Sequence, residues 1–155
     1  MVVTSGRPQA VKYKMAFDNY IKSKGLVGLK ALVAFSGKVD GKVLGKDDGS
    51  YGIDYDKEYT EYNLNPDMGS QDLRDMFELD EYRVMIVANK FQTGFNQPKL
   101  VAMYLDKKIS GVEAVQTLSR LNRTYPGKDQ TFVIDFANEP QTIIDAFKTY
   151  DEGAE

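Results

Sequence analysis

The chain of 155 residues contains no cysteine and no histidine. Without cysteine the protein has no disulfide framework, no thiolate nucleophile and no cysteine metal site, which suits a reducing cytosol. Without histidine it lacks the commonest general base and the commonest transition-metal ligand. Zinc and haem chemistry are therefore disfavoured and no metal site is predicted. Any chemistry must use carboxylates, lysine, arginine, tyrosine or hydroxyl groups.

Long apolar runs are also missing. No stretch approaches the ~20 consecutive apolar residues that a membrane helix needs. The opening residues MVVTSGRPQA lack the basic start and apolar middle of a signal peptide. We therefore expect a soluble, cytoplasmic protein with no membrane partner. Because 42% of the chain is hydrophobic, residues 1–155 are expected to form one globular domain.

Positive charge is unevenly distributed along the chain. The formal net charge is −3, which by itself argues weakly against a nucleic-acid-binding protein. Residues 90–128 nevertheless carry seven Lys or Arg and two acidic residues, so this segment has a net charge of +5 and the remainder −8. Because local potential decides where an anion binds, this asymmetry permits a basic face on an acidic domain.

Short apolar runs alternate with helical patterns along the chain. The run at residues 29–37 is typical of a strand buried on both faces, and further short apolar strands are predicted at residues 82–89, 100–106 and 131–138. Helices are predicted at residues 8–24, 70–79 with Ser70 as the cap, 112–123 and 140–150. The glycine-rich residues 37–56 are predicted to form a loop or hairpin. The alternation predicts an α/β fold with a mainly parallel sheet flanked by helices.

An acidic cluster lies between Asp47 and Glu61. Its spacing does not match a calcium-binding EF-hand loop, which places acidic ligands at every second position before a glycine. We interpret this segment as a solvated loop.

The loop NKFQTGFNQP, residues 89–98, follows the second predicted strand. Ligands in parallel α/β folds gather at such loops. Thr93 and Gly94 could offer a hydroxyl and backbone N–H groups to a phosphate, although a tight structural turn uses the same residue types. No G-x-x-x-x-G-K-[ST] motif is present in the chain, so the phosphates of a nucleoside triphosphate would need a second domain to hold them.

The segment QTLSRLNR, residues 116–123, places charge on one side of an apolar helix. At ~100° per residue, Gln116, Arg120 and Arg123 lie at roughly 0°, 40° and −20°. The opposite side carries the apolar residues Ala114, Val115, Leu118 and Leu121. Paired arginines suit a polyanionic phosphate because each guanidinium is a permanently charged fork of donors. The alternative is an ordinary solvated helix face.

Three motifs in this order resemble a known family. They are ALVAFS (motif IV), TGFNQP (motif V) and QTLSRLNR (motif VI), and the likeness is strongest over residues 82–138. This region resembles the second motor domain of the R subunit of type I restriction enzymes, which are superfamily-two DNA translocases. The resemblance implies a RecA-like α/β fold, of the P-loop NTPase type but without its own P-loop. Two such domains clamp ATP between them.

The resemblance also implies roles in ATP hydrolysis. Arg120 and Arg123 would act as arginine fingers toward the γ-phosphate, and Gln116 would help to sense the nucleotide state. Gly94 and Asn96 would lie near the ribose and phosphates. The family usually has aspartate at the position of Asn96, so no role that needs a negative charge there is expected. ATP and Mg would be bound mainly by the first motor domain.

Motifs IV and V imply contacts with DNA. Phe35 and Ser36 would lie beside the DNA path, and Asn89 and Thr93 would face the DNA backbone. The implied partners are double-stranded DNA, the first motor domain and nuclease domain of the same parent chain, and the modification and specificity subunits of a bacterial or archaeal enzyme. The parent would be an ATP-dependent type I site-specific deoxyribonuclease and translocase, and this fragment alone is expected to be inactive.

Two other functions are compatible with the residues. The first is a non-catalytic α/β module that binds a nucleotide or a protein, with Arg120 and Arg123 buried against Glu113 or Asp135. The second is half of a general RNA or DNA helicase, which would separate strands instead of translocating along the duplex.

Overall fold

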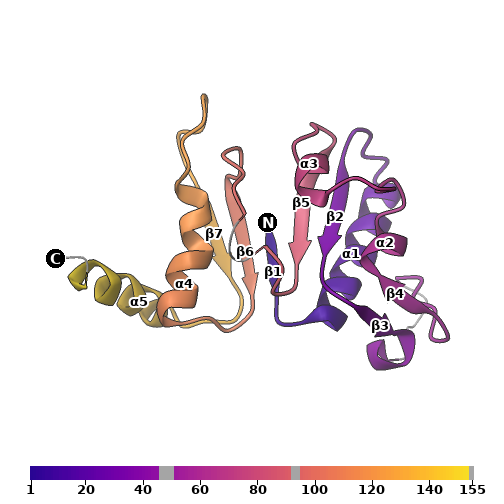
Figure 1. Ribbon diagram of the computed structural model, residues 1–155, viewed down its shortest axis with the longest axis horizontal. Helices are drawn as coiled ribbons and strands as arrows, with labels where there is room; N and C mark the ends of the chain where they lie inside the picture. The colour runs from indigo at the N-terminus through magenta and orange to yellow at the C-terminus, as the bar shows by residue number, and fades with distance from the viewer. Residues whose placement is uncertain (46–50, 92–94, 154–155) are drawn as a thin grey trace. The chain divides into compact units, whose positions relative to one another are not determined.

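The computed structural model describes residues 1–45, 51–91 and 95–153. The chain divides into two compact units: an amino-terminal unit, Thr4–Lys90, and a carboxyl-terminal unit, Phe91–Glu155 together with Met1–Val3. Parallel strand pairs flanked by helices occur in both units (Figure 1), which confirms the predicted α/β fold with mainly parallel strands. No helix among the described residues is long and apolar enough to cross a membrane.

The amino-terminal unit is built around two parallel strands, with a small antiparallel hairpin beside them. Its elements are α1 (Arg7–Ser23), β2 (Lys30–Ala34), β3 (Lys38–Asp40), η1 (Gly41–Leu44), β4 (Glu58–Thr60), α2 (Glu61–Leu64), α3 (Leu73–Met76) and β5 (Tyr82–Val87). The predicted helix at residues 8–24 and the two predicted strands of this unit are confirmed. The hairpin pairs β3 with β4, so its second strand lies beyond the predicted 37–56 segment.

The core of this unit lies along the β2–β5 pair. The register runs from Lys30 opposite Tyr82 to Ala34 opposite Val87. Except for the half-buried Val84, the apolar residues of both strands are buried. Helix α1 packs against β2 and β5, and its Ala10 and Val11 are fully buried. A strand buried in this way needs a continuous apolar sequence, which is why the pattern predicted it correctly.

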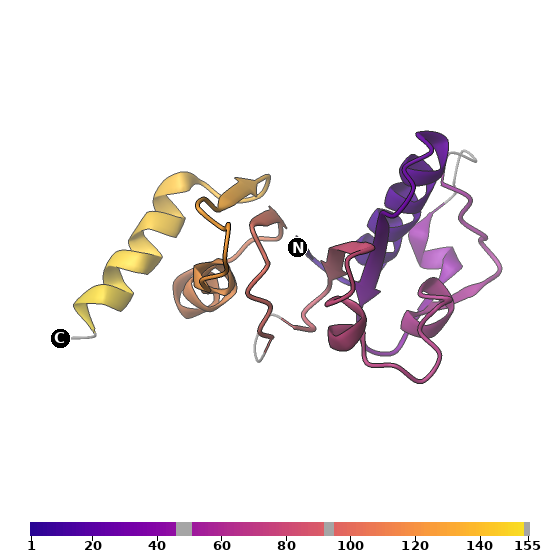
Figure 2. The same cartoon turned by 90° about the horizontal axis from the view of Figure 1, so that it is seen from above.

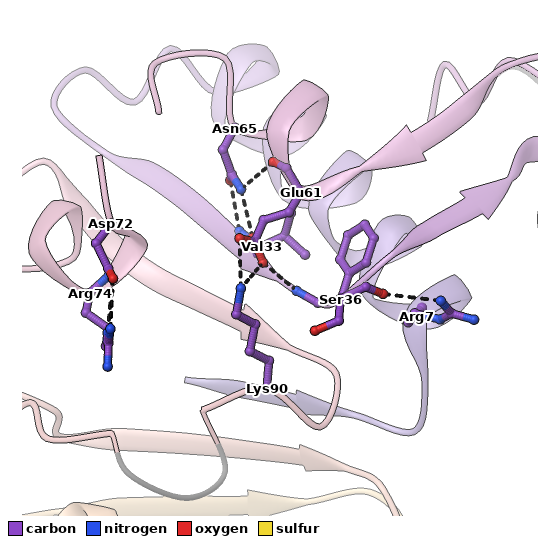
Figure 3. Close-up of polar contacts among 9 residues, drawn as sticks. Arg7, Val33, Ser36, Glu61, Asn65, Asp72, Arg74 and Lys90 are labelled. Carbon is purple, nitrogen blue, oxygen red and sulfur yellow. Dashed lines mark hydrogen bonds and ion pairs between the residues drawn. The ribbon is translucent and has the colours of Figure 1, made fainter. Parts of the chain in front are cut away.

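Helix α3 begins later than predicted. Its N-cap is Asp72, whose Oδ1 accepts a hydrogen bond from the Arg74 backbone N–H at 2.8 Å, so the assignment of Ser70 as the cap was wrong. Aspartate is as effective a cap as serine, and the sequence SQD offers both types within three residues. The Arg74 guanidinium also binds the Asp72 carboxylate, at 2.8 and 3.0 Å (Figure 3).

The Asp72–Arg74 pair predicts an acid-dependent contribution to stability. Hydrogen bonds from the Arg74 side chain and backbone lower the pKa of Asp72 from 3.8 to about 2. Because the folded-state pKa is depressed, the contribution is present above pH 3.8 and is lost as the pH falls through about 2. Carbon-13 NMR titration of the Asp72 carboxyl should give a midpoint near 2, and Arg74→Met should move it toward 3.8. An unchanged midpoint in Arg74→Met would contradict this cause.

The carboxyl-terminal unit also contains parallel strands. Its elements are β6 (Ala102–Asp106), α4 (Gly111–Leu118), η2 (Ser119–Asn122), β7 (Phe132–Asp135) and α5 (Pro140–Glu152), with α5 packed against α4 (Figure 2). The register of β6 and β7 runs from Ala102 opposite Phe132 to Leu105 opposite Asp135. Strands are found at both predicted positions and a helix at the predicted 140–150, whereas α4 ends before residue 123. The side chains of β7 are largely exposed.

Strand β1 (Val2–Thr4) was not predicted. Met1 beside it bonds through its nitrogen to Ala102 O and through its carbonyl to Tyr104 N–H, both at 2.9 Å, which is the parallel pattern. Thr4, the last residue of β1, belongs to the amino-terminal unit and donates its hydroxyl to Val87 O at 2.9 Å. A three-residue strand is too short to show an alternating or continuous apolar pattern.

Candidate functional site

The QTLSRLNR segment begins in α4 and ends just after η2. Gln116 and Arg123 are exposed, Arg120 is half-buried, and the predicted apolar side is buried at Ala114, Val115, Leu118 and Leu121. The α-helix tightens to a 3₁₀-helix at Ser119, so a single α-helix reaching residue 123 was a wrong prediction. Arg123 instead follows the helix in an extended conformation, with φ −76° and ψ 133°.

Arg120 is held against the predicted motif V segment. Its Nη1 donates a hydrogen bond to Phe95 O at 2.8 Å. The Phe95 ring is buried and stacks on Phe91, with ring centroids 5.4 Å apart. This contact joins motif VI to motif V within the carboxyl-terminal unit.

Arg123 presents its guanidinium on the surface. Within the described part of the chain, this side chain makes no hydrogen bond or ion pair. The two acids that the rival function would use have other partners: Glu113 binds Lys107 at 2.8 Å, and Asp135 accepts the backbone N–H groups of Ala137 and Asn138 at 2.9 Å. Arg123 therefore retains all its donors for a ligand outside the unit.

The structure describes only residues 95–98 of the motif V segment. Thr93 and Gly94 lie outside the described residues, so their predicted contacts stay predictions. Asn96 is exposed between the buried Phe95 and Gln97, and Gln97 Oε1 accepts the Lys99 backbone N–H at 3.1 Å. This arrangement anchors the backbone on both sides of Asn96 and leaves its amide accessible.

Asn89 begins the predicted DNA-contacting loop in a left-handed conformation. Its φ is 62°, and Lys90 N–H donates to Ala88 O at 2.7 Å across it. Asparagine tolerates this region better than most side chains do. The turn exposes Asn89 at the carboxyl end of β5, and such constrained residues are concentrated at functional sites.

The two motif IV residues differ in accessibility. The Phe35 side chain is 1% exposed and belongs to the core, whereas Ser36 is exposed. The Ser36 carbonyl accepts a hydrogen bond from Arg7 Nη1 at 3.2 Å. Of this predicted pair, Ser36 therefore has the side chain that a DNA backbone could reach.

Glu61 connects the ends of β2 and β5 (Figure 3). Its Oε2 accepts the Phe35 backbone N–H at 2.9 Å, and both carboxylate oxygens accept from Lys90 Nζ at 2.9 Å. Its side chain is only 15% exposed, so its interpretation as part of a solvated acidic loop was wrong. The capping box of Thr60 and Asn63, which starts α2, was a local signal that Glu61 stands on a helix.

Asn65 pairs with the outer edge of β2 (Figure 3). Its Oδ1 accepts Val33 N–H at 3.0 Å, and its Nδ2 donates to Val33 O at 2.8 Å and to Glu61 O at 2.8 Å. The amide thus replaces a neighbouring strand at that residue. Together with Glu61, it satisfies backbone groups that would otherwise be buried without partners.

Comparison with known proteins identifies the family. The sequence model of type I restriction enzyme subunit R domain 3 matches residues 1–138. The chain belongs to this family. The R-subunit domain is also 27% identical over 162 residues to a protein of Methanocaldococcus jannaschii described as the endonuclease subunit of type I restriction enzyme MjaVIIP. That alignment covers 100% of this chain and 14% of the relative.

A second relative is the endonuclease subunit of type I restriction enzyme HindI from Haemophilus influenzae. It is 30% identical over 74 residues, covering 46% of this chain and 7% of the relative. The R-subunit domain therefore spans a small fraction of the relatives it matches.

Within the described ranges, no three Asp or Glu side chains are grouped as ligands for a metal ion.

Proposed function

We propose that this R-subunit domain is the second motor domain of an ATP-dependent DNA translocase within a type I restriction enzyme. The observation that carries this proposal is the state of Arg123. It is exposed at the end of the motif VI helix with no partner among the described residues. An unpaired guanidinium beside a well-anchored segment suits a phosphate supplied by another domain.

Each motif residue has a separate proposed role in ATP hydrolysis. Arg123 reaches the γ-phosphate of ATP held mainly by the first motor domain, where its charge stabilises the charge that develops during phosphoryl transfer. Arg120 serves as the second finger from a position fixed by Phe95 O. Gln116, on the exposed side of α4, senses the nucleotide, and Gly94 and Asn96 contact the ribose and phosphates. Mg would neutralise phosphate charge when bound with ATP.

The proposed DNA contacts include the ends of two strands in the amino-terminal unit. Ser36 after β2 and Asn89 after β5 are exposed, and each would contact the duplex backbone. The contact predicted for Thr93 lies outside the described residues and is proposed from the motif alone. Phe35 supports Ser36 from the core. The parent subunit would combine this domain with a first motor domain and a nuclease domain, and would act with modification and specificity subunits on double-stranded DNA. The isolated domain would not hydrolyse ATP.

The rival non-catalytic module is less well supported. It predicts that both guanidiniums are engaged by acids of the fold, and the exposed Arg123 lacks such a partner among the described residues. The Arg120 contact with a backbone carbonyl keeps that side chain next to motif V.

A photoreactive ATP analogue tests the proposed site. The full-length R subunit, with DNA present, is irradiated with ATP that carries an aryl azide on its γ-phosphate. Because motif VI would face that phosphate, we expect labelling of the peptide that contains Gln116 and Arg123, and competition by excess ATP. Mass spectrometry locates the label. The proposal would be contradicted if labelling that excess ATP suppresses occurred only outside residues 111–128.

A further inference from the structure

Lys128 gathers three backbone carbonyls around its ammonium group. Its Nζ donates to Pro98 O at 3.0 Å, to Leu121 O at 2.9 Å and to Arg123 O at 2.6 Å. These carbonyls come from the end of the motif V segment, from η2 and from the residue that follows η2. One side chain therefore joins motif V to the backbone of Arg123.

A tight turn delivers this lysine to the carbonyls. Lys128 N–H donates to Tyr125 O at 3.0 Å, with Pro126 and Gly127 between them and Gly127 at φ +80°. Proline followed by a glycine with positive φ is the signature of a type II turn. The chain thus reverses directly after Arg123, and Lys128 returns to the end of the helix that precedes the turn.

The contacts leave Lys128 no donor for an external ligand. An ammonium has three N–H groups, and all three are directed at carbonyl oxygens of the fold. The last carbonyls of a helix lack partners within the helix and carry partial negative charge, which a cation complements. Lys128 is therefore suited to holding the backbone in place and not to binding phosphate directly.

The segment from Phe95 to Pro98 is consequently held by a cation at each end. Arg120 binds Phe95 O at 2.8 Å, and Lys128 binds Pro98 O at 3.0 Å. Asn96 is exposed between these two anchors, and Arg123 follows directly from the helix that bears Arg120. The relative placement of Asn96 and Arg123 thus depends on both cations.

We propose that Lys128 is a positioning residue that fixes the backbone of Arg123 against the motif V segment, so that the guanidinium is preorganised for the transition state. This inference rests on the proposed function of Arg123. A finger that acts in the transition state must be placed before the reaction, because misplacement of about 1 Å can cost roughly 10²-fold in rate.

Steady-state ATP hydrolysis by the full-length, DNA-activated R subunit tests this role. The variants are Lys128→Met, Arg123→Ala, the double variant, and Lys148→Met as the control, which removes an exposed lysine of α5 in the same unit. We expect Lys128→Met to lower kcat roughly 10- to 100-fold while leaving KM for ATP within about twofold. The double variant should be no slower than Arg123→Ala, and the control should match the parent.

The outcomes separate this inference from the proposed function. If Arg123→Ala hydrolyses ATP normally, the proposed function fails. If Arg123→Ala is inactive but Lys128→Met keeps the parent kcat, the positioning role alone fails. A rise in KM that matches the loss of kcat, or additive losses in the double variant, would instead indicate a general structural defect and would overturn the inference.

Lys128→Gln covers the case in which Lys128→Met does not fold. Its amide keeps two donors on a shorter side chain, so part of the carbonyl contacts should remain. We expect a loss of kcat smaller than that of Lys128→Met, of about tenfold or less, with KM unchanged. A parent-like kcat with these weakened contacts, or an equal change in KM, would also overturn the role of Lys128.

Discussion

Replacing Arg123 with alanine is expected to lower kcat for ATP hydrolysis by the full-length R subunit roughly 10³-fold or more, with nucleotide binding nearly unchanged. Arginine fingers in other nucleotide hydrolases contribute about 10³- to 10⁵-fold because their charge is matched to the transition state. Arg123 has the accessibility this role needs, since it is exposed and unpaired among the described residues. Single-turnover hydrolysis and equilibrium binding of a fluorescent ATP analogue would separate the two effects.

Arg83→Ala is the matched control for this experiment. Arg83 is an exposed arginine of β5 whose side chain contacts Asp80 O at 3.0 Å, and no catalytic role is proposed for it. Arg83→Ala removes the same charge and the same kind of side chain as Arg123→Ala, so the kcat of this variant should equal that of the parent. Normal hydrolysis by Arg123→Ala, or equal losses in both variants, would exclude a specific finger role for Arg123.

Replacing Asn65 with leucine is expected to lower the free energy of unfolding by roughly 2–5 kcal/mol. The substitution keeps a similar volume but leaves the N–H and C=O of Val33 without their partners, and each unsatisfied buried group costs about 1–3 kcal/mol. Asn65 is 3% exposed and Val33 is fully buried, so water cannot replace the lost bonds without opening the structure. Urea unfolding of the 155-residue chain, followed by circular dichroism, measures the change.

Asn63→Ala, within the short helix α2 whose C-cap is Asn65, provides the comparison. Asn63 is exposed and takes part in the capping box with Thr60. Removing it should cost about 1 kcal/mol or less, which is the ordinary value for a surface cap. If Asn65→Leu were no more destabilising than Asn63→Ala, the amide would not be needed at the edge of β2.

Most secondary structure could be predicted because its signals are local. The apolar runs of β2 and β5 and the helical pattern of α1 lie within consecutive residues, and they correspond to buried elements. Two predictions failed where the local signal was too weak or was ambiguous. Strand β1 has three residues and is defined by its partners, while the cap of α3 depended on which of two suitable residues begins the helix.

For the candidate site, the sequence predicted only which polar side chains face the solvent. The spacing of Gln116 and Arg123 relative to the apolar residues placed both on the solvent side, where the structure has them. The same spacing treated Arg120 and Arg123 as equivalent. Contact with Phe95 O and the change to a 3₁₀-helix distinguish them, and neither is encoded in helical periodicity.

The residues that hold the predicted motifs in place within each unit could not be recognised from the sequence. Glu61 was one acid in the cluster interpreted as a solvated loop, and Lys128 was only one of the positive charges counted in residues 90–128. Glu61 is instead directed at Phe35 N–H and Lys90, and Lys128 at three carbonyls. Such roles arise from hydrogen bonds between segments that are up to 30 residues apart.

By itself, the amino-acid sequence determined the α/β class, the separation of apolar and charged sides around motif VI, and the absence of cysteine and histidine chemistry. Periodicity and composition are properties of neighbouring residues, so these features needed no coordinates. The tertiary structure decided which charges are engaged and which remain accessible. Which charged side chains are engaged depends on where folding brings backbone carbonyls and side chains together. Lys128 and Arg120 bind carbonyls of the fold, and Arg123 is left exposed.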